Sequence, residues 1–171
     1  QRIYAIGKGP TQTTVTAPQA GIPEGSSVVL TGKVLDIAAG TLDPAIAARF
    51  PNGVAAVKDE CMSDWMKYVY TQFPFPMDAM GVDITIDVID ANGNYRNIGT
   101  ATTDPDGFFY FPWMPNIPGE YKVIATFAGS EAYYPSYAEA AFIVDQAPDP
   151  TPGPAATPAP RRQLTRPAPP S

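Results

Sequence analysis

Two acidic segments of the chain have the residue types and spacing of cation-binding loops. Asp90, Asn92 and Asn94 match the first three ligand positions of a calcium loop, because side-chain oxygens at alternate positions suit a hard cation. The glycine and the bidentate glutamate that complete such a loop are missing, so a polar hairpin is the favoured interpretation. Asp104 and Asp106 lie in an Asp-Pro-Asp-Gly sequence, which predicts a turn on backbone grounds alone. These two carboxylates are the candidate metal ligands of the chain.

No group of residues in the sequence predicts catalysis. The chain has no histidine, which excludes imidazole metal sites, Ser-His and Cys-His nucleophile pairs and c-type haem attachment. Asp83 and Asp87 project from one face of a predicted strand, but nothing supplies the cleft that acid-base catalysis requires, so we expect a solvated face. Cys61, the single cysteine, is interpreted as a half-buried hydrophobic residue, with a reactive thiol or an intermolecular disulfide as alternatives. We therefore expect no enzyme activity and no cofactor.

Four aromatic residues near strand ends are the candidate ligand-binding residues. Trp113, Tyr133, Tyr134 and Tyr137 would form a stacking platform for sugar rings if their side chains lay in one exposed row. The alternative, which we favour, is that they pack loops onto one end of the folded domain. Their exposure discriminates between a glycan-binding platform and a structural role.

The elements that must position these residues are β-strands, in which apolar and polar residues alternate between turn sequences rich in Gly, Pro, Asn and Asp. Strands are predicted at residues 13–17, 27–36, 82–88, 95–102, 108–113, 121–127 and 137–144. This spacing predicts an all-β fold, namely an antiparallel β-sandwich. Residues 37–57 are rich in Ala, Gly and Pro with weak periodicity, so we expect a long insertion without a core strand.

One amphipathic helix is predicted at about residues 59–72, inserted in the sandwich. Asp59 is the expected N-cap, and two prolines end the helix. Its apolar residues recur at spacings of three and four: Met62, Trp65, Met66, Val69, Tyr70 and Phe73. We expect this face, including Phe73, to pack against a sheet. The alternative is an exposed docking face on which Trp65 and Met66 contact a partner protein.

Both ends of the chain are predicted to lie outside the sandwich domain, which spans residues 11–146. Residues 1–10 contain a short apolar strand that could be donated to another sheet. Residues 147–171 hold nine of the 21 prolines and few large apolar side chains, so we expect an extended arm. The candidate partner-binding residues in these two segments are Ile3, Tyr4, Ile6, Arg161, Arg162 and Arg166.

Charge is distributed unevenly along the chain. Residues 1–146 hold 8 basic and 16 acidic groups, a net charge of −8, whereas the arm carries three arginines against one aspartate, a net charge of +2. An acidic domain is a poor nucleic-acid binder. The arm could dock on an acidic surface, including another copy of the domain, or serve as a solvated spacer. No apolar stretch reaches the length of a membrane span.

Several motifs of the chain have the sequence of a known module. They are Gly99–Asp104, Asp106–Phe108, Trp113, Pro118–Ser130, Tyr133–Tyr134 and Ser136. Together they resemble the second half of bacterial and archaeal Ig-like repeat domains, which are extracellular, non-catalytic spacer and adhesion modules. In a version from archaeal surface proteins, where the module follows quinoprotein-like β-propeller repeats, Ile6–Pro10 and the helix Asp59–Tyr70 also look similar. The resemblance covers residues 3–145 and implies an exported Ig-like sandwich at or outside the cell surface.

We therefore predict an Ig-like β-sandwich with one inserted helix and a proline-rich arm. Its expected function is structural: a subunit or spacer of a cell-surface or filamentous assembly, joined to copies of itself or to another surface protein by strand addition and arm docking. The alternatives are a glycan-binding or calcium-dependent module and an accessory subunit of an extracellular electron-transfer complex.

Overall fold

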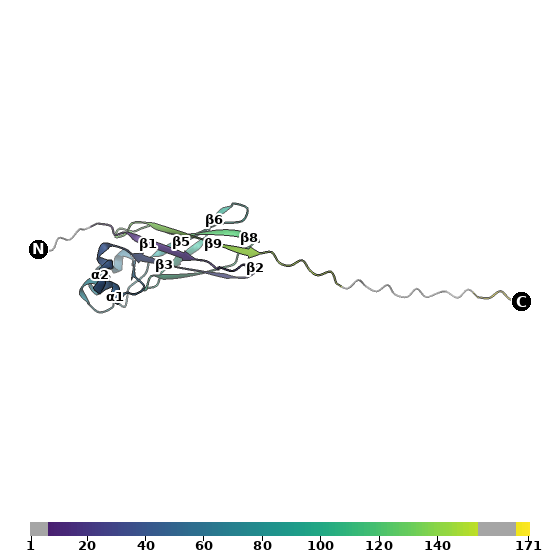
Figure 1. Cartoon of the computed structure of the whole chain (residues 1–171), viewed down its shortest axis with the longest axis horizontal. Coiled ribbons are helices and arrows are strands. Elements are labelled where there is room, and N and C mark those ends of the chain that lie inside the picture. The colour runs from purple at the N-terminus through teal and green to yellow at the C-terminus, as the bar shows by residue number, and fades with distance from the viewer. Residues whose placement is uncertain (1–6, 154–166) are drawn as a thin grey trace.

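Two β-sheets pack face to face in the computed structural model, which describes residues 7–153 and 167–171 of the chain (Figure 1). The four-stranded sheet contains β1 (Thr11–Thr16), β3 (Val28–Asp36), β4 (Val54–Ala55) and β7 (Phe108–Trp113), with β3 at its centre. The five-stranded sheet has the order β2 (Ile22–Pro23), β9 (Ser136–Asp145), β8 (Gly119–Phe127), β5 (Asp83–Ile89) and β6 (Tyr95–Thr102). The all-β sandwich predicted from the alternating pattern is confirmed.

The strand pairings are antiparallel except for one. β1 pairs with β3 in the first sheet, and the chain then crosses so that β2 pairs in parallel with the end of β9 in the second sheet. The succession β9, β8, β5 matches the G, F and C strands of an immunoglobulin sandwich, with β3 and β7 in the places of B and E. The topology is therefore Ig-like.

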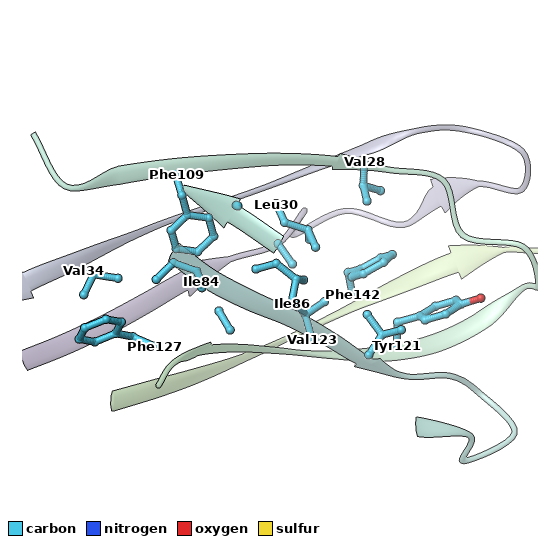
Figure 2. Close-up of a cluster of buried hydrophobic side chains, with 14 of the residues drawn as sticks. Val28, Leu30, Val34, Ile84, Ile86, Phe109, Tyr121, Val123, Phe127 and Phe142 are labelled. Carbon is cyan, nitrogen blue, oxygen red and sulfur yellow. The ribbon is translucent and has the colours of Figure 1, made fainter. Parts of the chain in front are cut away.

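The core lies between the two sheets and consists of the inward residues of each strand. Val28, Leu30 and Val34 of β3 face the row Ile84, Ile86 and Val88 of β5, and all six side chains are buried. Figure 2 labels five of these side chains between the layers, those of Val28, Leu30, Val34, Ile84 and Ile86, together with Phe109, Tyr121, Val123, Phe127 and Phe142. Each such burial contributes roughly 1.5–3 kcal/mol, so the alternating pattern fixes which face of each strand turns inward.

A buried tyrosine closes one end of the sandwich. The Tyr121 hydroxyl donates to the carbonyl oxygen of Ile117 at 3.0 Å and accepts from the amide of the same residue at 3.2 Å. The ring stacks on Phe142 with centroids 5.4 Å apart and meets Trp113 edge to face. A tyrosine near the start of strand F that bonds back to the preceding corner is a hallmark of Ig-like sandwiches.

The segment between β3 and β5 is more ordered than its sequence suggests. It forms a 3-10 turn at Ala39–Leu42, the short helix α1 (Pro44–Arg49) and β4, which pairs with the end of β3. Residues 54–57 are all buried. The prediction that residues 37–57 contain no core strand was wrong, because a two-residue strand is too short to show a period-two pattern.

Within the described residues, no helix has both the length and the apolar character that crossing a membrane requires.

Candidate partner-binding surface

The helix α2 (Met62–Thr71) covers one end of the sandwich with the insertion and the segment after it (Figure 1). Trp65 and Val69 are 2% and 0% exposed and pack in a second hydrophobic cluster with Val54 and Val57. The predicted packing face is therefore formed in part: Met62 and Met66 are half-buried, but Tyr70 is 41% exposed, contrary to its predicted packing. Trp65 is too deeply buried to present an open docking face, which corrects its assignment as an exposed partner contact.

Phe73 does not belong to the packed face of the helix. The helix ends at Thr71, because Gln72 adopts a left-handed conformation with φ 59° and turns the chain away. Phe73 is 56% exposed as a result, contrary to its predicted burial.

Asp59 anchors the helical end to the sandwich instead of capping the helix. It begins a 3-10 turn (Asp59–Cys61), and its carboxylate accepts hydrogen bonds from the Ser130 hydroxyl at 2.8 Å and from the amides of Glu131 and Ala132. Partial burial acts to raise the pKa of Asp59, but these hydrogen bonds and the nearby Lys8 outweigh burial and lower it. The predicted N-cap role was wrong because the carboxylate is used by a loop 71 residues away in sequence.

An aromatic cleft opens beside α2. Its rings come from the end of α1, from α2 and from the following segment: Phe50, Trp65, Tyr68 and Phe75. Tyr68 meets Phe50 and Phe75 edge to face at centroid distances of 5.6 and 5.3 Å. The cleft holds about 130 Å³, which is below the roughly 300 Å³ of sites for drug-sized ligands. It therefore suits one or two side chains of a peptide.

One polar group of the cleft has no partner. The Trp65 indole Nε1 is buried and makes no hydrogen bond to any described residue. A buried indole N–H normally finds an acceptor, because leaving it unpaired costs about 1–3 kcal/mol. Arg49 at the rim is already engaged: its guanidinium donates to the carbonyl oxygens of Val69 and Tyr68 at 2.9 and 3.0 Å.

Exposed apolar side chains surround this end of the molecule. Residues of the segment after α2 are 41–91% exposed, namely Phe73, Phe75, Met77 and Met80. Aromatic residues and methionine are the types enriched in protein interfaces. Sequence reasoning missed this segment and the cleft residues Phe50, Tyr68 and Phe75. The alternation of Phe and Pro in residues 73–76 was the available signal, because prolines prevent regular structure that would bury those rings.

The four candidate sugar-stacking residues do not form one row. Trp113 lies against Tyr121, whereas Tyr133 is 2% exposed and lies against Phe127. Tyr121 and Phe127 are six residues apart in β8, which places these two contacts at opposite ends of the sandwich, about 20 Å apart. Tyr134 and Tyr137 are the exposed pair, at 55% and 68%. The sugar-stacking platform, the less favoured interpretation, is therefore not formed, and the favoured packing role holds for Trp113 and Tyr133, although at opposite ends of the sandwich.

Tyr133 and Asp36 form a buried polar contact below the helix. Burial raises the pKa of Asp36, although hydrogen bonds from the Ala38 amide and from Tyr133 oppose that effect. Burial also raises the pKa of Tyr133 well above its usual range, and the neighbouring Asp36 charge adds to the shift. The contact lies where β3 ends, and both residues are buried, at 6% exposed for Asp36 and 2% for Tyr133.

The carboxylates of Asp90 and Asp104 accept hydrogen bonds from backbone amides of their own loops. Asp90 accepts hydrogen bonds from the amides of Asn92 and Asn94, and Asp104 accepts from those of Asp106 and Phe108, both at 2.9 Å. Among residues 7–153 and 167–171 no group of three or more Cys, Asp or Glu side chains converges as metal ligands do. The geometry is that of polar turns: Asp104 begins one such turn, Asp106 is its third residue, and the Gly107 amide closes it on the Asp104 carbonyl oxygen at 2.9 Å.

The remaining candidate carboxylates differ in their surroundings. Asp83 is exposed and pairs with Lys58 at 3.4 Å. Asp87 is only 7% exposed and accepts a hydrogen bond from Asn97, so the solvated face predicted for both holds for Asp83 alone. A register shift between Ile86 and Asp87 brings Asn97 opposite Asp87, an irregularity that the sequence pattern does not show.

Cys61 and the chain ends complete the set of candidates. Cys61 is buried, with its thiol 3.4 Å from both the Asp78 carbonyl oxygen and the Met80 amide, which fits the packing interpretation. The candidate partner residues at the two ends lie outside the described residues: Ile3, Tyr4, Ile6, Arg161, Arg162 and Arg166.

The chain has little similarity to known proteins. No family model matches the chain, and no curated protein matches it. Two solved chains match, and one of them is described as the tetra-tandem repeat in the extending region of a large adhesion protein. Over 80% of this chain it has 14% sequence identity and a TM-score of 0.44, and the match spans 24% of that protein's chain.

Proposed function

We propose that this chain is a non-enzymatic structural module, a spacer or subunit of an extracellular assembly. The observation that carries the proposal is the path of the chain. Thr11, at the start of β1, bonds the Ser136 hydroxyl at the start of β9, whereas the chain leaves at Asp145, the other end of this ten-residue strand. The two points are about 30 Å apart along the sandwich. The chain therefore enters the module at one end and leaves it at the other, as a spacer requires.

The filled interior and the sequence resemblance support the same proposal. The inward faces of both sheets contribute one continuous set of buried apolar side chains between the layers. Members of the Ig-like repeat family that the sequence resembles are extracellular spacers and adhesion modules. Neighbouring chains would be joined through the proline-rich arm and at the open edge of β6, which pairs with β5 alone among the strands that the structure describes.

Mechanical stretching of the whole chain tests the spacer function. We expect one unfolding event when the chain is pulled between its ends, because β1 and β9 are each bonded along their length to a neighbouring strand. Unfolding residues 11–145 would release about 440 Å of chain, which is about 3.5 Å per extended residue less the roughly 30 Å that the folded module already spans. Extension at low force without a resolved event, or a much shorter release, would refute a spacer that resists force.

A further inference from the structure

We propose that the aromatic cleft beside α2 binds the proline-rich arm, residues 147–171, of a second copy of this chain. The inference rests on the proposed structural function and deepens it, because it names the partner of the module. It joins two features at opposite ends of the molecule: the cleft lies at the helical end, and the arm leaves from the end of β9 (Figure 1).

The chemistry of the cleft complements that of a proline-rich peptide. Proline-rich segments adopt the polyproline II conformation, have no internal hydrogen bonds and dock in grooves lined by aromatic rings. The cleft supplies such rings from Phe50, Tyr68 and Phe75 and a volume of about 130 Å³, suited to small rigid side chains. Trp65 also lines the cleft, but it is only 2% exposed and its Nε1 is buried, so the arm would contact the other three rings.

Charge favours the arm of this chain as the occupant. The arm has a net charge of +2 and residues 1–146 have a net charge of −8. Asp106 lines the rim of the cleft and is exposed, while the rim's own cation, Arg49, is held by two backbone carbonyls. Asp106 is therefore open to an incoming arginine of the arm, although Arg49 keeps its positive charge, and the net charge of −8 on residues 1–146 attracts the arm at longer range. Added salt should weaken the contact, since exposed charges are screened within about 10 Å at 0.1 M ionic strength.

The direction of the arm favours a second copy over the same molecule. Residues 146–153 lead away from the sandwich, beyond the end farthest from α2 (Figure 1). To reach its own cleft the arm would have to reverse and run back along the sandwich, whereas a copy placed in line presents its cleft in the arm's path. Such a contact joins different surfaces of the two copies, so each copy can bind a further one. The copies then form an open chain, unless the rotation that relates one copy to the next closes them into a ring.

The two tryptophans provide a direct test by NMR, because the whole chain has only two indole N–H signals, from Trp65 and Trp113. We expect the Trp65 signal to move as the protein concentration rises, and to move further when a synthetic peptide of residues 147–171 is added. The Trp113 signal, at the other end of the sandwich, should stay in place. A Trp65 signal that does not move at millimolar peptide would overturn the proposal.

Three variants of the full chain sharpen this test. Phe75→Ser removes a cleft ring and should weaken peptide binding about tenfold, the worth of one aromatic contact; Met77→Ser, at a 91% exposed neighbour outside the cleft, should change it less than twofold. Replacing the nine prolines of the arm by serine should abolish the concentration dependence while leaving the sandwich intact. Equal binding by the Phe75 and Met77 variants, or unchanged association of the proline-free arm, would contradict the proposal.

The same data distinguish docking of the arm in the cleft of its own molecule from docking in the cleft of a second copy. A Trp65 signal that depends on the arm's prolines but not on protein concentration would show docking within one molecule and would overturn the second copy as partner. The stretching experiment uses single chains and needs no association. A module that bears force but does not bind its arm would therefore refute this inference alone, and the proposed spacer function would stand.

Discussion

Gly32 is the position where the core should tolerate a side chain least. It lies in the middle of β3, between Val15 of β1 and Phe109 of β7. A Cβ atom added there would overlap the backbone carbonyl oxygen of Thr14 and lie 2.5 Å from two carbons of the Phe109 ring. Neither neighbour can move freely, because one is backbone within a sheet and the other is a fully buried ring. Overpacking of this kind costs about 1–3 kcal/mol, and two rigid neighbours place Gly32→Ala near the upper limit, about 3 kcal/mol.

Thermal unfolding measures this cost. For a domain of this size 1 kcal/mol corresponds to a fall in Tm of about 3–4 °C, so we expect Gly32→Ala to lower Tm by about 10 °C. Gly153→Ala is the matched control, since an added Cβ there meets nothing within 4 Å, and it should leave Tm unchanged. In a Phe109→Leu background the cost of Gly32→Ala should fall by about 1 kcal/mol, because part of the overlap is relieved. A Gly32→Ala protein as stable as the natural chain would refute the packing of β7 across β3.

Three further predictions concern single groups of the fold. Tyr121→Phe removes both hydroxyl hydrogen bonds to Ile117 and should lower the free energy of unfolding by about 1–2 kcal/mol, measured by urea denaturation. No change in that free energy would contradict a stabilising role for these two hydrogen bonds. Gln72→Gly should raise Tm by roughly 2–3 °C, because glycine adopts the left-handed conformation at the end of α2 without strain, and a lower Tm would count against that helix end. Burial raises the pKa of Asp36, so ionisation of this carboxyl opposes folding, and its share of stability is present at acid pH and lost as pH rises through the raised pKa. Asp36→Asn should therefore gain stability relative to the natural chain between pH 3 and pH 7 in denaturation curves recorded across that range, and a constant difference would contradict the raised pKa.

The segment after α2 could not be interpreted from sequence alone. Trp65 and Phe73 were both predicted on the apolar face of the helix, yet one is 2% exposed and the other 56%. The difference arises at Gln72, a residue with no particular preference for the left-handed conformation that it adopts. A shift of one residue in the position where a helix ends changes which aromatic side chains are buried, and local sequence determines that position poorly.

Asp59 and Asp87 show a related limit. Their sequence neighbourhoods predict a helix cap and a solvated strand position. In the structure, the Asp59 carboxylate accepts hydrogen bonds from the loop around Ser130, and Asp87 is buried beside Asn97. A carboxylate binds whichever donors the fold brings to it, and those donors are distant in sequence.

The strands themselves were determined by the sequence, because a period of two with turn residues between the segments is a local property. The segment 95–102 was predicted with its observed bounds, and the alternation in residues 82–88 correctly assigned Ile84, Ile86 and Val88 to the core. Tertiary structure alone decided the aromatic cleft, since its rings come from α1, α2 and the segment after α2. It also decided that the chain enters and leaves at opposite ends of the sandwich. Both depend on contacts between distant residues, which the free energy of packing the whole core selects and no local pattern records.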